Sequence, residues 1–143
     1  MIIVSVISCS NNQRKQQVAA TISNGELLAT SLAYVLKQKS LPVEYYNQPL
    51  QIVKSSKYRI ISRLRVNGID CVLLPEDTNV GLVLKHADVF KPIPLVEVGD
   101  LKIIDDLIDI EIILRATGHN FKLKLKTDKN KNYRILELKE ATI

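Results

Sequence analysis

The chain has 143 residues, 46% of them hydrophobic, with a formal net charge of +5 at pH 7 and a pI near 9.2. This length and hydrophobic content suit one ordinary domain, or two small lobes that share a core, and they exclude a disordered tail. No apolar run approaches the ~20 residues that cross a bilayer. The apolar start, residues 1–9, has no basic segment before it, so no signal peptide is expected and we predict a cytoplasmic protein.

The charged residues are unevenly distributed along the chain. Lysine and arginine concentrate at 54–65 and 122–134, whereas acids gather at 97–111. A basic surface beside a separate acidic segment is typical of a protein that contacts both a nucleic acid and a protein partner, although a net charge of this size also occurs on simple solvated faces.

The first elements are predicted to be a strand and a helix. Residues 2–8 alternate and are rich in β-branched side chains, which favours a strand. Ser23 and Glu26 have the spacing of a helix capping box. The helix that follows would place four apolar residues on one face, namely Leu28, Leu32, Val35 and Leu36. Pro42 would end it, 43–46 would be a short strand, and 47–49 is the predicted boundary between an N-terminal lobe (1–49) and a second domain (50–143).

Residues 58–75 allow two interpretations. In a hairpin, Asn67 and Gly68 would form a type I′ turn that brings Arg65 opposite Asp70 and Val66 opposite Ile69. In a helix followed by a strand, Gly68 would close a helix whose apolar stripe is Val53, Ile60, Ile61 and Leu64. We favour the helix and strand, because on a helix the basic residues project away from that stripe.

The second half is predicted to be rich in strands. Residues 80–84 and 93–98 are short apolar runs that read as strands. Residues 120–127 and 133–138 alternate around a polar turn, which predicts an antiparallel hairpin.

The segment 101–117 fits two secondary structures. Its isoleucines at 108, 110 and 112 alternate as in a strand, but its apolar residues also fit a buried helix capped by Asp100 and closed by Gly118. Periodicity leaves both alternatives open.

Residue types exclude several kinds of active site. There is no glycine-rich phosphate loop, no Gly-x-Ser-x-Gly and no metal-ligand cluster, so neither a metal nor a cofactor is expected. Only His86 and His119 are available as histidine acids or bases, and both fit ordinary surface positions.

Asp88 and Glu97 resemble the acidic pair of restriction-type nucleases, but Gly99 stands where that chemistry needs a lysine. Cys9 and Cys71 lie in apolar runs and are predicted to be buried free thiols.

From Tyr58 onward the chain resembles the C-terminal domain of the archaeal tRNA splicing (tRNA-intron) endonucleases. That domain has a tyrosine, a Leu-Arg pair, a glycine and then a strand, matched here by Tyr58, Leu64-Arg65, Gly68 and residues 69–74. Further similar segments are the leucine-rich residues 27–45, Ala87-Asp88, Leu95-Val96 and Leu114-Arg115-Ala116, the last of which begins a helix in the family. The resemblance implies an α+β chain with a small N-terminal α/β lobe and a restriction-endonuclease-like C-terminal domain of mixed α/β structure.

The resemblance also implies which catalytic groups are missing. The family cleaves RNA without a metal, using a tyrosine, a histidine and a lysine. The tyrosine position is Pro92 here, and no histidine stands among the residues before Leu95. Only Lys122 matches, and it also reads as a solvent-facing lysine of an alternating strand. The chain therefore resembles the structural, non-catalytic subunit of a heterotetrameric member.

Contacts are implied in the same way. Precursor tRNA with a bulge-helix-bulge would be held by Arg115, Lys122 and Lys124. An acidic loop bearing Glu97 and Asp100 would enter the catalytic partner subunit, and the apolar C-terminal strand, with Tyr133 and Ile135, would pair across an interface. The alternative function is a small basic α/β interaction module, binding nucleic acid or protein, with no enzymatic complex.

Overall fold

The computed structural model describes residues 25–56, 58, 63–87, 91–130 and 132–142. The strand expected at 2–8 and the capping residue Ser23 lie outside these residues. So do Cys9, Asp88 and the pair Ile60 and Ile61.

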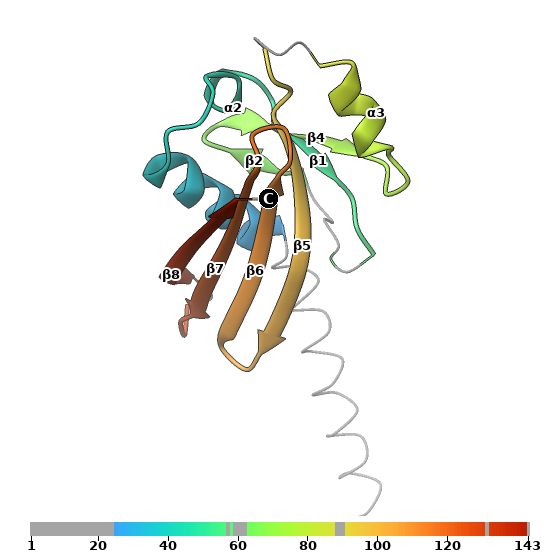
Figure 1. The fold of residues 1–143 in the computed structure, drawn as a ribbon. Coiled ribbons are helices and arrows are strands. Elements are labelled where there is room, and N and C mark those ends of the chain that lie inside the picture. The colour runs from blue at the N-terminus through green and yellow to red at the C-terminus, as the bar shows by residue number, and fades with distance from the viewer. Residues whose placement is uncertain (1–24, 57, 59–62, 88–90, 131, 143) are drawn as a thin grey trace, which may run out of the picture.

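A six-stranded mixed sheet forms the main body of the described chain, with the strand order β4-β1-β5-β6-β7-β8 (Figure 1). Its strands are β1 (Gln51–Val53), β4 (Val72–Leu74), β5 (Leu95–Ile104), β6 (Leu107–Leu114), β7 (His119–Thr127) and β8 (Tyr133–Thr142). β1 runs parallel to both β4 and β5, whereas β5 to β8 form an antiparallel meander. The α+β class is confirmed, and so is the predicted C-terminal hairpin.

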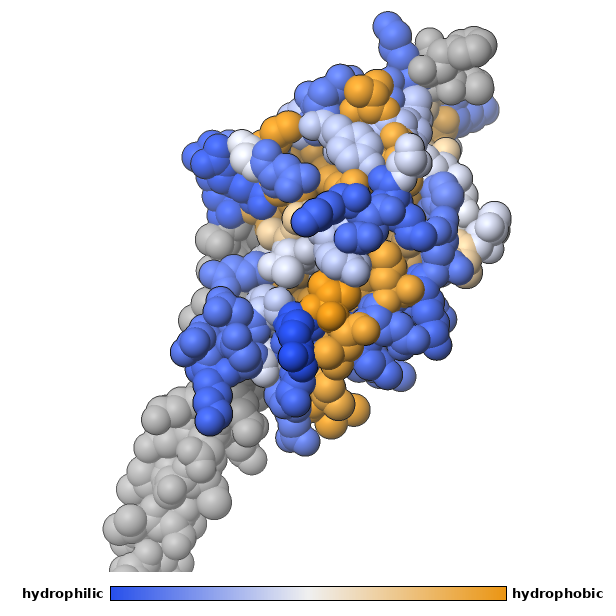
Figure 2. Space-filling view, turned by 90° about the vertical axis from the view of Figure 1, so that its left-hand side faces the viewer, coloured by the Kyte–Doolittle hydropathy of each residue, from blue (hydrophilic) through white to orange (hydrophobic). Residues whose placement is uncertain are grey.

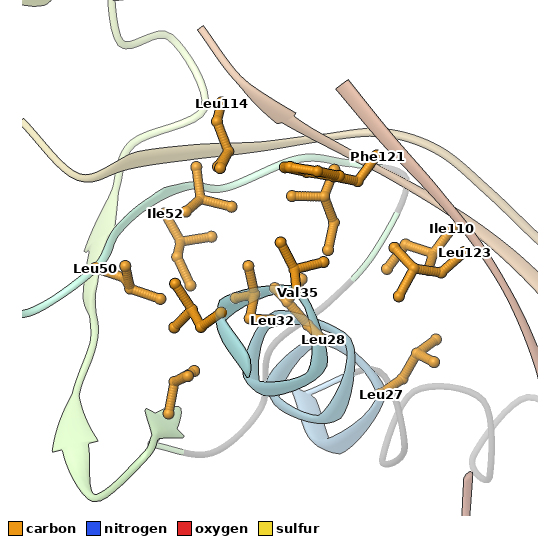
Figure 3. Close-up of a cluster of buried hydrophobic side chains, with 14 of the residues drawn as sticks. Leu27, Leu28, Leu32, Val35, Leu50, Ile52, Ile110, Leu114, Phe121 and Leu123 are labelled. Atoms are coloured by element: carbon orange, nitrogen blue, oxygen red, sulfur yellow. The ribbon is translucent and has the colours of Figure 1, made fainter. Parts of the chain in front are cut away.

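A helix at residues 25–38 packs across one face of this sheet, which we call the inner face (Figures 1 and 3). The four apolar residues predicted on one helix face are all buried. They meet inward-pointing side chains of the sheet, among them Ile52, Ile110, Phe121 and Leu123. Because burying one such side chain stabilises a fold by about 1.5–3 kcal/mol, this stripe provides much of what holds the helix to the sheet. The boundary near residue 49 stays a prediction.

Residues 43–46 are helical, so the strand predicted there is wrong. α2 (Glu44–Asn47) is a single turn in which the carbonyls of Pro42 and Val43 accept backbone hydrogen bonds from Tyr45 and Tyr46 at 3.0 and 2.9 Å. The hydroxyl of Tyr46 also donates to the carbonyl of Leu36 at 2.9 Å. This side-chain link satisfies a carbonyl at the end of the preceding helix, which a period-two pattern does not reveal.

Residues 65–70 form a hairpin, so the favoured helix that Gly68 would close is wrong, whereas the strand predicted after it is present at residues 69–70 and 72–74. β2 (Arg65–Val66) and β3 (Ile69–Asp70) pair with Arg65 opposite Asp70 and Val66 opposite Ile69, which is the register of the alternative interpretation. Asn67 and Gly68 have φ of 51° and 79°, as a type I′ turn requires. The burial order supports the strand, because Leu64 and Val66 are buried and Arg65 between them is exposed.

Residues 80–84 are also helical, contrary to the predicted strand. α3 (Val80–Lys85) begins after Asn79, whose side chain accepts a hydrogen bond from the N–H of Leu82 at 3.0 Å. This N-cap fixes the first turn and outweighs the strand preference of the two valines.

The open segment 101–117 consists of strands rather than a helix. β5 continues to Ile104 and β6 begins at Leu107, with Ile103 opposite Ile108 across the turn. Asp100 therefore lies inside a strand and caps no helix. Where the family resemblance implies a helix at Arg115, the chain makes a turn in which the N–H of Gly118 bonds to the carbonyl of Arg115 at 3.3 Å.

Alternation gives the meander two different faces. In β6 and β7, every second residue is buried against the helix, and the residues between them form the outer face. The outer face is charged, with Asp109 and Glu111 on β6 and Lys122, Lys124 and Lys126 on β7. The residues with predicted functions lie on this face or along β8.

Candidate functional site

The three residues predicted to bind RNA come from neighbouring parts of the meander. Lys122 and Lys124 stand on the outer face of β7, and Arg115 lies in the turn that joins β6 to β7. Lys126, Lys102 and Lys139 add further positive charge to this side of the sheet. The sequence did not single these three lysines out, although their alternation within strands marks them as outward-facing.

Acidic side chains are interleaved with these lysines. In the sheet register, Lys122 stands opposite Glu111, and Lys124 stands between Asp109 and Glu137. The ammonium of Lys122 is 3.9 Å from a carboxylate oxygen of Glu111. These residues line a shallow depression of about 250 Å³. Lys139 stands opposite Lys122 on its other side, but Asp100, Asp109, Glu111 and Glu137 also line the depression, so the outer face presents a mosaic rather than a basic patch.

The guanidinium of Arg115 forms an ion pair with the carboxylate of Glu97. Its Nε donates to Oε2 of Glu97 at 2.8 Å, and its Nη2 lies 3.4 Å from Oε1 of the same carboxylate. This hydrogen bond, with the charge of Glu97, raises the pKa of Arg115. Two predicted roles, base stacking by Arg115 and insertion of Glu97 into a partner, thus meet in one ion pair within the chain.

Glu97 and Asp100 lie in β5 and not in a projecting loop. The pairing with β6 slips between Val98 and Leu101, which makes a bulge that contains Gly99. A Cβ at Gly99 would stand 1.9 Å from Oε1 of Glu111, so the carboxylate of Glu111 lies directly over the glycine. The missing side chain of Gly99 therefore leaves room for the carboxylate of Glu111 on the outer face.

Tyr133 and Ile135 line a groove at the start of β8. The groove has a volume of about 610 Å³, and its other walls come from the helix at 25–38, from Tyr46 and from the β2–β3 turn. Most of its lining is apolar or aromatic, including Ala33 and Tyr34. These two predicted interface residues are thus brought together, on a different surface from Glu97 and Asp100.

β8 forms one edge of the sheet. It pairs with β7 on one side, and among the described residues no strand pairs with its other side. Figure 2 views the molecule from the side on which β8 lies and shows an apolar strip bordered by hydrophilic residues. Leu136 on this strand is 44% exposed. A long strand with open backbone donors and acceptors is a ready site for pairing with another strand.

The groups needed for RNA cleavage do not gather at Lys122. His119 stacks on Phe121 of the inner face with ring centroids 5.7 Å apart, and His86 follows α3. Neither histidine therefore shares the outer face with Lys122. Tyr45 and Tyr58 are buried, and this desolvation raises the pKa of each hydroxyl to about 12, which makes both poor bases.

Further features of the described residues concern a metal site, a free cysteine and a membrane-spanning helix. Within them, no group of three or more histidine, cysteine, aspartate or glutamate side chains is placed to hold a metal ion. Cys71 is a free thiol, as predicted, but it is only partly buried, and this burial raises its pKa. No helix among the described residues is long and apolar enough to cross a membrane.

Comparison with known proteins identifies no relative: no family model, no curated protein and no solved structure matches the chain.

Proposed function

We propose that this chain is a non-catalytic subunit that acts by assembling with other protein chains. The open edge of β8 is the observation that carries this proposal. Its ten residues are in strand conformation, and an added strand would satisfy backbone groups that β7 leaves unpaired. The groove lined by Tyr133 and Ile135 adds apolar surface beside that edge.

The chemistry of the outer face supports binding rather than catalysis. Cleavage of RNA without a metal requires a base, an acid and a cation directed at one phosphate. On the outer face Lys122 stands beside Glu111 and Lys139, with no described histidine near it. A lysine in such a place can hold a phosphate, but among the described residues the tyrosine and histidine that the family uses as base and acid do not stand beside it.

The assembly we propose is a cytoplasmic, heterotetrameric tRNA-intron endonuclease. Support comes from the sequence motifs of that family, from the loss of its tyrosine at Pro92, and from the position of Arg115, Lys122 and Lys124 on one side of the sheet. In this proposal residues 50–143 take the place of the restriction-endonuclease-like domain. A catalytic partner subunit would cut precursor tRNA at bulge-helix-bulge sites, and this chain would support the partner.

Reconstitution tests the proposal. The purified chain is mixed with a catalytic subunit of this family that is inactive alone, and cleavage of a bulge-helix-bulge precursor is followed in EDTA. We expect no cleavage by either chain alone and cleavage by the mixture. Lys122→Ala should leave the cleavage rate of the mixture within about threefold, because the partner supplies the reacting groups. Cleavage by this chain alone would contradict the non-catalytic role.

The charge mosaic favours a second candidate, an interaction module outside any enzyme. Acids beside Lys122, Lys124 and Lys126 weaken attraction for a polyanion, so the main partner would be a protein rather than RNA. Co-purification separates the two candidates. A partner with the Tyr, His and Lys set supports the endonuclease, whereas a stable partner without nuclease activity supports the module.

A further inference from the structure

We infer that the groove between the helix at 25–38 and the start of β8 binds an unpaired nucleotide of a single-stranded RNA. The base would stack on tyrosine rings of the groove, and the phosphate would lie at Lys37. The inference goes beyond the proposed function, because it gives the groove an occupant that needs no catalytic partner. None of Arg115, Lys122 and Lys124 lines the groove.

One face of the helix forms a wall of the groove. Four of the lining residues are spaced by three or four positions, so they lie on the same side of the helix; they are Thr30, Ala33, Tyr34 and Lys37. The rise of about 1.5 Å per residue makes this wall about 10 Å long. The lysine stands at the carboxyl end of the wall, one turn after the tyrosine.

β8, α2 and the β2–β3 turn supply the other walls. Ile135 points to the inner side of the sheet, because it stands opposite the buried Leu125 of β7. Tyr133, Tyr46 and Asn67 complete the lining. Figure 2 looks onto the side where α2 and β8 lie, and residues of intermediate hydropathy stand in its middle. The volume of about 610 Å³ falls in the range of roughly 300–1,000 Å³ that is usual for small-ligand sites, so a base and its sugar can enter.

Aromatic rings are concentrated in this groove. Three of the five tyrosines of the chain line it, namely Tyr34, Tyr46 and Tyr133. The ring of Tyr46 is held in place, since its hydroxyl donates to the carbonyl of Leu36 at 2.9 Å and accepts from the N–H of Leu41 at 3.3 Å. The residue is nevertheless 39% exposed. A fixed and accessible ring offers a stacking platform that needs little ordering when a base binds.

Lys37 gives the groove an unopposed positive charge. It is exposed, it is the only charged residue in the lining, and no ion pair joins it to another residue that the structure describes. By contrast, Nζ of Lys39 lies 2.7 Å from Glu140, and Lys122 on the outer face stands beside Glu111. An ammonium group next to aromatic rings, without a carboxylate nearby, is complementary to a nucleotide phosphate.

The polar groups of the lining favour a nucleotide over an apolar protein segment. Such a segment would cover the rings but would leave the ammonium of Lys37 and the amide of Asn67 without partners, which is costly. An unpaired base presents donors and acceptors on its edge for an amide, and its phosphate matches the lysine. A duplex is excluded from the groove, because its bases are stacked on one another.

Binding of the full-length chain to a short fluorescein-labelled oligoadenylate tests the inference by anisotropy. The chain has no tryptophan, so quenching of its tyrosine emission by the unlabelled strand reports stacking directly. Tyr34→Ala should weaken binding by at least about fivefold, the lower end of what one stacked base contributes. Tyr34→Phe keeps the ring and should bind within about twofold of the wild type. Lys37→Ala should lower the slope of log affinity against log salt by about 0.7, and Lys37→Arg should keep the slope.

Lys91→Ala is the matched control for loss of one positive charge, because Lys91 is exposed and lies outside the groove. It should leave the affinity and the salt slope unchanged. Circular dichroism should show that every variant folds. An abasic strand of the same length keeps the phosphates and lacks the bases, so it should bind at least about tenfold more weakly than oligoadenylate.

Several results would overturn the inference. Equal binding of the abasic strand, or of Tyr34→Ala, would show that no base stacks in the groove. Adenosine monophosphate that binds as tightly as the strand would exclude RNA as the occupant. A wild-type chain whose tyrosine emission no strand quenches would leave the groove to a protein segment. Cleavage by the reconstituted mixture is measured separately, so a failure here leaves the proposed function intact.

Discussion

The carboxylate of Glu97 and the guanidinium of Arg115 are joined at 2.8 Å, although the sequence resemblance implies separate roles for them in protein and RNA binding. A base that stacks on Arg115 would meet a guanidinium whose Nε edge is already held by Glu97. We expect a double-mutant cycle with Glu97→Gln and Arg115→Gln, measured by urea unfolding, to give a coupling of about 0.5–1 kcal/mol, because the arginine is half exposed. A coupling of zero would mean that Arg115 is already free in solution.

The interleaved acids should make RNA binding by the lone chain weak. Lys122→Ala or Lys124→Ala should each lower the affinity for a bulged RNA by less than about threefold, measured by fluorescence anisotropy at several salt concentrations. Glu111→Gln should raise the affinity, because it removes the negative charge beside Lys122. Lys85→Ala on α3 is the control. A tenfold loss from Lys122→Ala alone would instead show a dedicated phosphate contact.

Replacement of Gly68 should cost stability through backbone conformation alone. Its φ is +79° and nothing lies within 4 Å of an added Cβ, so Gly68→Ala brings conformational strain without a clash. We expect a loss of about 1 kcal/mol in the free energy of unfolding. Gly81→Ala, in helix α3 without a positive φ, is the matched control and should be neutral or stabilising. Equal effects at both positions would contradict the type I′ turn.

The sequence predicted the helix at 25–38 and the hairpin of β7 and β8 well, because one physical signal dominates each of them, whereas it left residues 101–117, which belong to β5, β6 and a turn, open between strand and helix. Leu28, Leu32 and Val35 recur at helical spacing and are buried, and the alternation of β7 matches its two faces. In β8 the alternation is interrupted at Leu136, where the pairing with β7 shifts. The sequence also indicates the Asn-Gly turn, but the apolar stripe of Val53, Ile60, Ile61 and Leu64 favours a helix there. Val53 belongs to β1, so that stripe joined residues from different elements.

The predictions for the short elements were wrong because single side-chain contacts determine whether these segments are helical or extended. α2 depends on the hydrogen bond from the hydroxyl of Tyr46 to the carbonyl of Leu36 in the preceding helix. α3 depends on its N-cap, Asn79, which is a common N-cap residue and could have been recognised in the sequence. The ion pair of Glu97 and Arg115 joins residues 18 apart, and only the strand register brings them together. For the same reason, the acids that offset Lys122 and Lys124 could not be assigned before β6 and β7 were aligned.

Gly99→Ala should act through Glu111. The added Cβ would overlap the carboxylate of Glu111, which must swing away from Lys122 and from the side chain of Asn120. We expect Gly99→Ala to lower the free energy of unfolding by about 1–2 kcal/mol, and the same change in a Glu111→Ala background to cost much less. Thermal and urea unfolding of the four proteins give this comparison. Additive effects would mean that the bulge, and not Glu111, resists the substitution.

Glu140 should make the fold sensitive to acid. Its carboxylate is 2.7 Å from Nζ of Lys39 at the end of the helix and 2.7 Å from Nδ1 of His119. The hydrogen bond from Lys39, aided by the one with His119, lowers the pKa of Glu140. A lowered folded-state pKa adds stability above the ordinary glutamate value of about 4.3, and this stability is lost as the pH falls through the folded-state pKa. Glu140→Gln should therefore reduce the unfolding free energy at pH 7 and approach the wild type near pH 3.

Lys39→Ala provides the control for this pH dependence. Without the ammonium, the pKa of Glu140 should rise towards its ordinary value, so the gap between wild type and Glu140→Gln should shrink in this background. Urea unfolding between pH 3 and pH 7 measures both gaps. If the difference in unfolding free energy caused by Glu140→Gln is as large without Lys39 as with it, the stabilisation comes from His119. If this difference is the same at every pH, ionisation of Glu140 is not its cause.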